Sequence, residues 1–155
     1  MKNDREGQAA ILTNADCSKI RTQIRSRKYK LLFDLGSYTG ERWGAIVQLR
    51  IADIYNQDGS PREYINFRAR TRKAKPNSKR RAQPPKRKNR QVPVHPILQE
   101  MLLAYKPESD SQWLFPGPVG DKHISFRRAD AILRAAVEKA GLSSKGISTH
   151  STRRT

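Results

Sequence analysis

The stretch YTGERWGAIVQLRIAD, residues 38–53, marks the point where the hydrophobic pattern of this sequence changes. Before it, apolar residues recur at helical spacing, and Gly40 is a natural helix end because glycine adopts the left-handed conformation at little cost. After it, short apolar runs separated by turn residues indicate strands. The sequence therefore predicts an α+β fold, a mainly helical domain with a small three-stranded antiparallel β-sheet.

The predicted elements follow from spacing and capping residues. We expect a first helix within residues 11–24, capped by Thr13 or Asn14, and a last full helix that begins after Ser125 and ends near Gly141. A further helix begins at the C-terminus, where Ser148 or Thr149 is the candidate cap. The other expected helices are 27–40, 41–50 and 97–105, and the expected strands are 53–55, 62–67 and 91–94.

Positive charge dominates the composition. Lys and Arg number 32 against 14 Asp and Glu, which gives a formal net charge of +18 and indicates a polyanionic partner. Residues 68–90 hold twelve of the basic residues and no acid, and the sequence predicts a flexible basic hairpin insertion there, able to order on a phosphate backbone. Its candidate DNA-binding residues are Arg68, Arg70, Arg72, Lys75, Lys79, Arg80, Arg81, Lys86, Arg87, Lys88 and Arg90.

Other features narrow the class of protein. Residues 1–10 are expected to form a flexible tail, followed by a single domain over residues 11–155. The lone Cys17 is expected to be a packing residue, and three scattered histidines with one cysteine predict no metal site. The sequence has no apolar run long enough to cross a membrane and no hydrophobic signal region, so a cytoplasmic, nucleoid-associated protein without a membrane partner is expected.

Three residues are candidate functional residues. Arg42 stands at a helix start, where free backbone N–H groups and the helix dipole favour an anion. His150 and Arg153 are spaced three apart, so on a helix they share a face. Taken singly, each is more commonly a surface or ion-paired residue.

Their order and context resemble a known family. T-G-x-R at 39–42, L-x-x-x-D at 49–53 and H-x-x-R at 150–153 resemble the motifs of the catalytic domain of tyrosine recombinases, the phage-integrase family. The resemblance covers roughly residues 11–155. It implies site-specific cleavage and rejoining of double-stranded DNA through a 3′-phosphotyrosyl intermediate, with no metal or other cofactor.

The resemblance also implies roles for individual residues. Arg42 and Arg153 would hold the non-bridging oxygens of the transition state, and His150 would bind the phosphate and assist proton transfer. A hairpin lysine would protonate the leaving oxygen; strand register favours the position of Arg70, but arginine is too weak an acid, so Lys73 is preferred and Lys75 stands behind it. Arg154 is a further candidate DNA-binding residue, in addition to those of residues 68–90.

The sequence departs from the family pattern in two places. Ala45 stands where many members carry an acid, which leaves the support of Arg42 to another residue such as Asp53. The nucleophilic tyrosine of the family lies well beyond the H-x-x-R box, so we expect a DNA-binding fragment truncated before its nucleophile and inactive alone. The tyrosines present are expected to pack in helix faces and strands: Tyr29, Tyr38, Tyr55, Tyr64 and Tyr105.

Two other functions stay open at this point. One is a natural non-catalytic DNA-binding regulator derived from a recombinase. The other is a basic RNA-binding module, although the sequence has no aromatic stacking motif of the usual kind. The resemblance implies a tetramer on DNA for the full-length protein, whereas this fragment is expected to be a monomer.

Overall fold

The computed structural model describes residues 11–71, 88–107 and 111–154, with the backbone alone for Arg70, Arg153 and Arg154. The predicted tail 1–10 and most of the predicted basic insertion lie outside the described residues. The elements are, in chain order, α1 (Asn14–Gln23), α2 (Arg27–Thr39), α3 (Trp43–Ile46), α4 (Ile51–Ile54), β1 (Tyr64–Phe67), the 3₁₀ helix η1 (Ala69–Thr71), β2 (Arg90–Pro93), α5 (Pro96–Tyr105), α6 (Phe126–Lys139), and the 3₁₀ helices η2 (Ser143–Lys145) and η3 (Thr149–Arg154).

The predicted caps begin and end the helices. Thr13 Oγ1 accepts the backbone N–H of Asp16 at 3.1 Å and the Asp16 carboxylate accepts that of Thr13, so a reciprocal capping box starts α1. Gly40 follows α2 with φ of 65°, in the left-handed conformation expected of a helix-ending glycine. Ser125 accepts the N–H of Arg128 and starts α6. These boundaries follow from local sequence.

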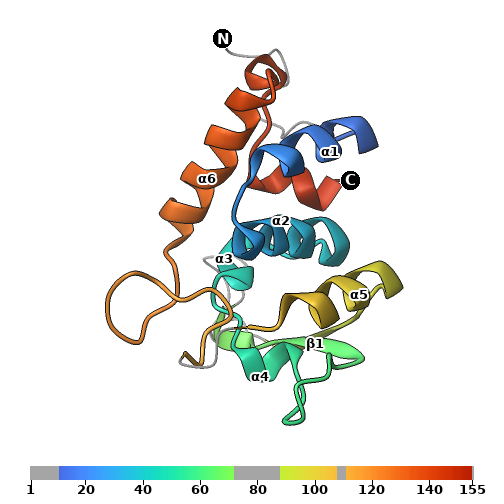
Figure 1. Ribbon diagram of the computed structural model, residues 1–155, viewed down its shortest axis with the longest axis vertical. Coiled ribbons are helices and arrows are strands. Elements are labelled where there is room, and N and C mark those ends of the chain that lie inside the picture. The colour runs from blue at the N-terminus through green and yellow to red at the C-terminus, as the bar shows by residue number, and fades with distance from the viewer. Residues whose placement is uncertain (1–10, 72–87, 108–110, 155) are drawn as a thin grey trace, which may run out of the picture.

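Helix α2 is the centre of the fold. It lies between α1 and η3 on one side and α5 on the other, and it also packs against α3 and α6 (Figure 1). Leu32 and Leu35 of α2 are fully buried, together with Ile20 of α1 and Leu102 of α5. One continuous core therefore joins α1, α2 and α5.

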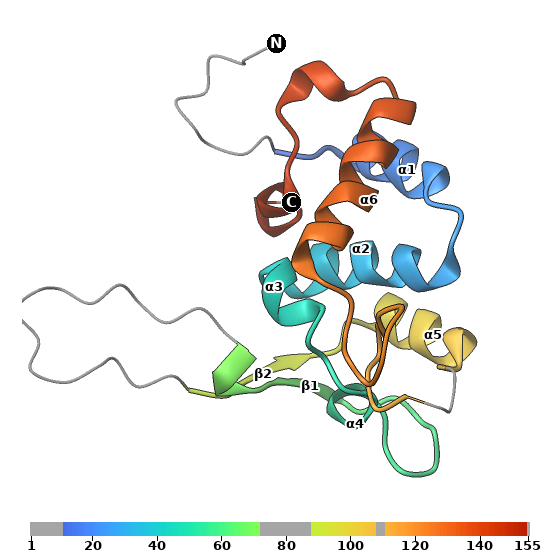
Figure 2. The ribbon, with the colours of Figure 1, turned by 90° about the vertical axis from the view of Figure 1, so that its left-hand side faces the viewer.

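The sheet is smaller than predicted. Strands β1 and β2 pair antiparallel, with Tyr64 opposite Pro93 and Phe67 opposite Arg90, and they lie beside α4 and α5 (Figure 2). In the described part of the chain this sheet has two strands, because residues 53–55, the predicted third strand, lie mostly in α4. The Asp53 carboxylate accepts the N–H of Arg50 at 2.9 Å and so starts a helical turn.

The C-terminal segment takes a tighter form than an α-helix. Residues Thr149–Arg154 form η3, and Ser148 caps its start, since the Ser148 hydroxyl accepts the N–H of His150 at 3.3 Å. Ser151 and Thr152 are buried, whereas His150 between Thr149 and Ser151 is exposed. The segment thus anchors itself to α2 and presents the histidine outward.

Candidate functional site

The turn between α2 and α3 positions Arg42. The Arg42 carbonyl accepts the N–H groups of Ala45 at 3.0 Å and Ile46 at 3.1 Å, so Arg42 is the N-cap residue of α3. Its side chain is half-buried, and its guanidinium makes no hydrogen bond or ion pair with the part of the chain that the structure describes. The backbone of Arg42 is therefore fixed by α3, and its guanidinium is available to bind an anion.

A buried hydrogen bond joins this turn to the C-terminal motif. The indole N–H of Trp43 donates to Thr152 Oγ1 at 3.0 Å, and the Thr152 hydroxyl donates to the carbonyl of Thr149 at 3.0 Å. Trp43 directly follows Arg42, and Thr152 directly precedes Arg153. The contact therefore brings the T-G-x-R and H-x-x-R segments side by side, although 109 residues separate its two ends.

Gly36 of α2 makes room for that contact. A Cβ at this position would lie 2.5 Å from Trp43 Nε1 and 2.9 Å from Thr152 Oγ1, closer than a Cβ atom approaches a non-bonded atom. The absence of a side chain at Gly36 is what lets the indole and the hydroxyl meet against the helix. Sequence reasoning did not single out Gly36, Trp43 or Thr152 for this role.

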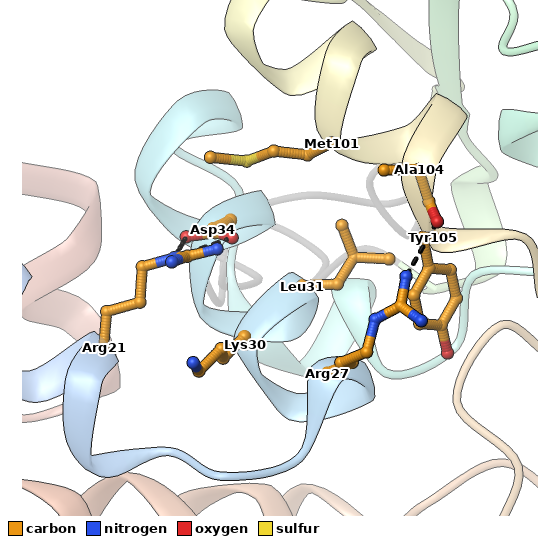
Figure 3. Close-up of a pocket in the computed structure, with 8 residues that line it drawn as sticks. All are labelled: Arg21, Arg27, Lys30, Leu31, Asp34, Met101, Ala104 and Tyr105. Carbon is orange, nitrogen blue, oxygen red and sulfur yellow. Dashed lines mark hydrogen bonds and ion pairs between the residues drawn. The ribbon is translucent and has the colours of Figure 1, made fainter.

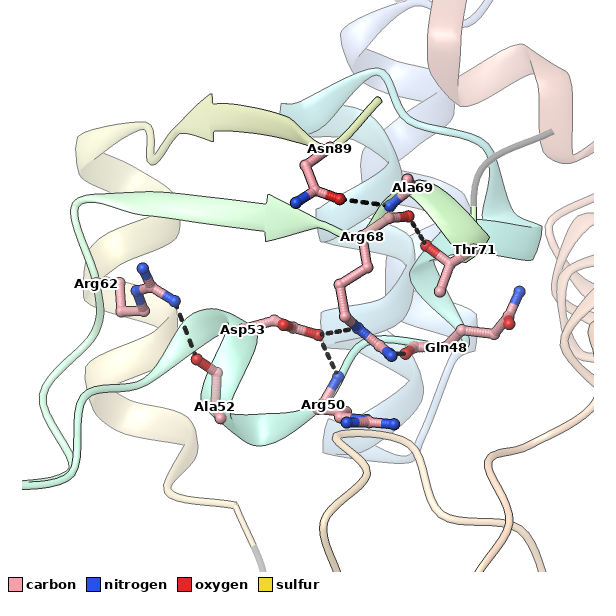
Figure 4. A network of polar contacts seen from close by, with 9 residues as sticks. All are labelled: Gln48, Arg50, Ala52, Asp53, Arg62, Arg68, Ala69, Thr71 and Asn89. Atoms are coloured by element: carbon pink, nitrogen blue, oxygen red, sulfur yellow. Dashed lines mark hydrogen bonds and ion pairs between the residues drawn. The ribbon is translucent and has the colours of Figure 1, made fainter. Parts of the chain in front are cut away.

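Two ion pairs attach the hairpin to the helical body. Arg68, which follows β1, donates from Nε to the Asp53 carboxylate at 3.3 Å and from Nη2 to the Gln48 carbonyl at 2.7 Å (Figure 4). Arg90, which begins β2, donates from Nη1 to the Glu41 carboxylate at 2.8 Å. Both arginines were predicted to contact DNA, and both carry an internal partner.

The Asp53 carboxylate accepts from the Arg50 backbone and from Arg68 (Figure 4). Within the described part of the chain it makes no hydrogen bond or ion pair with Arg42. The acid that contacts the Arg42 residue is Glu41, whose Oε1 accepts the Arg42 backbone N–H at 3.2 Å. Glu41 is only 4% exposed. The signal available in the sequence was an acid directly before the candidate catalytic arginine, and the motif-based prediction did not include it.

The remaining predicted site residues are only partly described. Lys73, the preferred general acid, lies outside the described residues. The backbones of Arg153, Arg154 and Arg70 lie in η3 and η1, and Lys88 is exposed. The predicted residues that also lie outside the described part are Arg72, Lys75, Lys79, Arg80, Arg81, Lys86 and Arg87.

A separate basic pocket lies between α1, α2 and α5 (Figure 3). Its volume is about 180 Å³, which is below the usual range for ligand pockets. Arg21 pairs there with Asp34 at 2.9 Å, and Arg27 donates to the Ala104 carbonyl at 2.7 Å. Burial raises the pKa of the Asp34 carboxyl above its ordinary value, and the hydrogen bond from Arg21 opposes that rise. Both arginines of this pocket therefore have partners inside the fold.

Four of the five tyrosines pack in or against the core as expected, and the fifth, Tyr64, is exposed. The Tyr55 hydroxyl donates to the Leu102 carbonyl at 2.6 Å, and burial raises the pKa of that phenol strongly. The Tyr38 ring lies 5.1 Å from that of His95. Tyr64 is exposed on β1, Tyr105 lines the pocket of Figure 3, and Tyr29 packs against the core. None of these positions belongs to the Arg42 turn or to η3.

Two features are absent from the described residues, a metal-binding cluster and a membrane-spanning helix. No three His, Cys, Asp or Glu side chains lie close enough together there to hold a metal ion. Likewise, none of the helices described is both long and apolar enough to span a bilayer.

Comparison with known structures finds the same fold. XerA recombinase superposes with a TM-score of 0.67 and 18% identity, covering 94% of this chain and 48% of that one. XerH site-specific recombinase bound to difH substrate superposes with a TM-score of 0.63 and 18% identity, covering 94% of this chain and 41% of that one. A lambda integrase dimer bound to a COC′ core site superposes with a TM-score of 0.65 and 17% identity, covering 94% of this chain and 39% of that one. The chain thus spans less than half the length of each of these three proteins.

A search of curated protein sequences gives no match. The model of the phage integrase family matches residues 6–155, almost the whole chain. The match agrees with the order of the three motifs and with a mainly helical fold that carries a small antiparallel sheet. The chain belongs to the phage integrase family, and its fold is that of the tyrosine recombinase catalytic domain.

Proposed function

We propose that this chain is the phosphate-binding part of a tyrosine recombinase catalytic domain and that it binds double-stranded DNA around a scissile phosphate. The observation that supports the proposal best is the Trp43–Thr152 hydrogen bond, because it brings Arg42 next to the segment of His150 and Arg153. Arg42 and the residues of η3, which are far apart in the sequence, can then contact one phosphate.

The chemistry of the residues suits strand cleavage and joining. Phosphoryl transfer builds negative charge on the non-bridging oxygens, and two arginines can hold those oxygens as preorganised donors. Arg42 and Arg153 are proposed for this role. His150, exposed at the start of η3, is proposed to bind the phosphate and assist proton transfer. Lys73 is proposed to protonate the leaving 5′-oxygen.

The basic insertion is proposed to bind the DNA backbone outside the reacting phosphate. Each neutralised phosphate releases counterions, so affinity should fall steeply with salt. Arg68 and Arg90 are expected to contribute less than the others because they already bind Asp53 and Glu41. The residues proposed to make most of these contacts are Arg70, Arg72, Lys75, Lys79, Arg80, Arg81, Lys86, Arg87, Lys88 and Arg154.

Relatives support this partner. The solved XerH and lambda integrase structures are complexes with DNA sites, and we extend duplex DNA as a partner to this chain. The chain spans under half of those proteins. We propose the complete recombination reaction and a tetrameric assembly on DNA for a full-length recombinase that contains this domain. The chain by itself is proposed to be a monomer.

The test measures affinity for a fluorescent duplex by anisotropy over a series of salt concentrations. Arg42→Met should weaken binding about tenfold, the value of one charge-assisted phosphate contact. Arg27→Met is the matched control, since it removes the same charge from the pocket of Figure 3. An equal loss of duplex affinity in the two variants would mean that binding depends only on net charge. It would overturn the proposal that Arg42 contacts a phosphate.

A second candidate is a DNA-binding protein without cleavage activity. It is favoured by the positions of the five tyrosines, since Tyr55 is buried and hydrogen-bonded and none of the five lies in η3 or between Gly40 and Arg42. Nicked duplexes incubated with this chain and run on denaturing gels distinguish the two candidates. We expect no covalent adduct, and an adduct that survives denaturation would reveal a nucleophile within this chain.

A further inference from the structure

Glu41 combines burial, charge and a contact with Arg42. Its carboxylate uses both oxygens: Oε1 accepts the Arg42 N–H at 3.2 Å and Oε2 accepts Arg90 Nη1 at 2.8 Å. Its own N–H donates to Thr39 Oγ1 at 3.1 Å, and the Thr39 hydroxyl donates to the Leu35 carbonyl at 2.6 Å. A chain of hydrogen bonds thus runs from α2 through Glu41 to the hairpin.

No other position supplies an acid at this turn. Ala45, one turn further along, has no carboxylate and is only 2% exposed. The Asp53 carboxylate is engaged by Arg50 and Arg68. The α2–α3 turn therefore depends on Glu41 for its link to a cation.

The link reaches the element that carries the basic insertion. Arg90 is the first residue of β2 and lies opposite Phe67, the last residue of β1. A buried carboxylate is costly unless it is paired, so Glu41 and Arg90 hold each other's positions. One carboxylate therefore connects the start of β2 to the backbone N–H of Arg42.

We propose that Glu41 is a positioning residue for Arg42 and that its ion pair with Arg90 couples the Arg42 turn to the β1–β2 hairpin. The inference rests on the proposed function, since it assumes that Arg42 binds a DNA phosphate. Glu41 itself touches no DNA. Its effect on binding is indirect, through the geometry of the turn.

The sign of the effect distinguishes positioning from simple electrostatics. Glu41→Gln removes a negative charge from a DNA-binding protein, which alone should tighten duplex binding. Loss of positioning should weaken it. Asp53→Asn is the matched control, because it removes the same charge from the other ion pair of the hairpin and leaves Glu41 in place.

The experiment measures anisotropy with a fluorescent 20-base-pair duplex at about 0.1 M salt, where screening is moderate, and thermal unfolding of each variant. Glu41→Gln should weaken binding about fivefold, whereas Asp53→Asn should leave it equal or tighter. In the Arg42→Met background, Glu41→Gln should change affinity by less than about twofold, because a positioning residue has nothing left to position.

Glu41→Asp is a second variant that tests the same role if Glu41→Gln does not fold. It keeps the charge and shortens the side chain by one methylene, so a weakened affinity in a folded protein is geometric in origin. Equal or tighter binding by folded Glu41→Gln and Glu41→Asp, while Arg42→Met still weakens binding, would overturn the positioning role. No effect of Arg42→Met would instead overturn the proposed function.

Discussion

The arginines of the pocket in Figure 3 and the arginine of the α2–α3 turn are held in opposite ways. In the pocket, Arg21 pairs with the Asp34 carboxylate and Arg27 donates to the Ala104 carbonyl, so both charged groups are used within the fold. In the turn, the backbone of Arg42 is fixed by α3 and Glu41, and its guanidinium has no partner among the described residues.

The difference separates structural cations from candidate binding cations. An arginine with an internal acceptor gains little from a phosphate, because it must give up the contact it already has. An arginine whose backbone is fixed and whose donors are unused pays less to bind an anion. Charge alone does not identify a site in a chain with a net charge of +18.

The largest effect on the turn is expected from Gly36→Ala. The added Cβ would press on Trp43 Nε1 at 2.5 Å and separate the indole from Thr152. We expect a loss of about 2–3 kcal/mol in the free energy of unfolding, measured by urea denaturation. Gly44→Ala is the control, since a Cβ there meets nothing within 4 Å, and it should be neutral or stabilising by about 0.5 kcal/mol. Similar costs in both variants would refute the packing argument.

Thr152→Val should have the next largest effect. It leaves the buried indole N–H of Trp43 without an acceptor, at a cost of about 1–3 kcal/mol. Thr152→Ser keeps the hydroxyl and should lose no more than about 1 kcal/mol for the missing methyl group. The same urea denaturation measures both, and a Val variant as stable as the Ser variant would show that the hydrogen bond contributes nothing.

Breaking the ion pair of the pocket should cost less. Arg21→Met leaves the buried Asp34 unpaired, but the Arg21 side chain is 42% exposed, so we expect about 1 kcal/mol of destabilisation. Arg134→Met, in an ion pair where the arginine is 75% exposed, should cost less than about 0.5 kcal/mol. Duplex affinity should be the same for both variants; a selective loss with Arg21→Met would place the pocket at the DNA.

The smallest effect concerns pH. The pKa of Asp34 is raised above 3.8 by burial, so the folded state binds its proton first and stability gains from this group as pH falls toward 3.8. The pKa of Asp16 is lowered by the hydrogen bond from Lys145, so its contribution is present above 3.8 and is lost as pH falls below that value.

Urea denaturation over a pH series therefore separates the two carboxyls. Asp34→Asn should flatten the change above pH 3.8, and Asp16→Asn should flatten the loss below it, each by less than about 1 kcal/mol. If Asp34→Asn altered only the limb below pH 3.8, the assigned rise in its pKa would be wrong.

Local sequence was a good guide to the helices and a weaker guide to the sheet. Thr13, Ser125 and Gly40 act as the predicted caps, because capping depends on residues within one turn. Residues 53–55 were predicted as strand, but the Asp53 carboxylate caps a helical turn at Arg50 and leaves Tyr55 with one isolated bridge to Pro61. A short apolar run does not distinguish the two outcomes.

The motifs predicted the family, and the family match confirms it. They did not predict which basic residues are engaged inside the fold. In the sequence, Arg68 and Arg90 belong to one basic run. In the structure, Arg68 pairs with an acid 15 residues away along the chain and Arg90 with an acid 49 residues away. Asp53 was considered as support for Arg42, whereas its carboxylate binds Arg68 and the acid beside Arg42 is Glu41.

The sequence by itself determined the helix caps, the excess of positive charge, and the order of the T-G-x-R and H-x-x-R motifs, because these depend on residue type and short spacing. Only the tertiary structure decided that Trp43 meets Thr152 over Gly36 and that Glu41 meets Arg90. Such contacts join distant segments, and they form only where packing of the core around α2 brings those segments within hydrogen-bond distance.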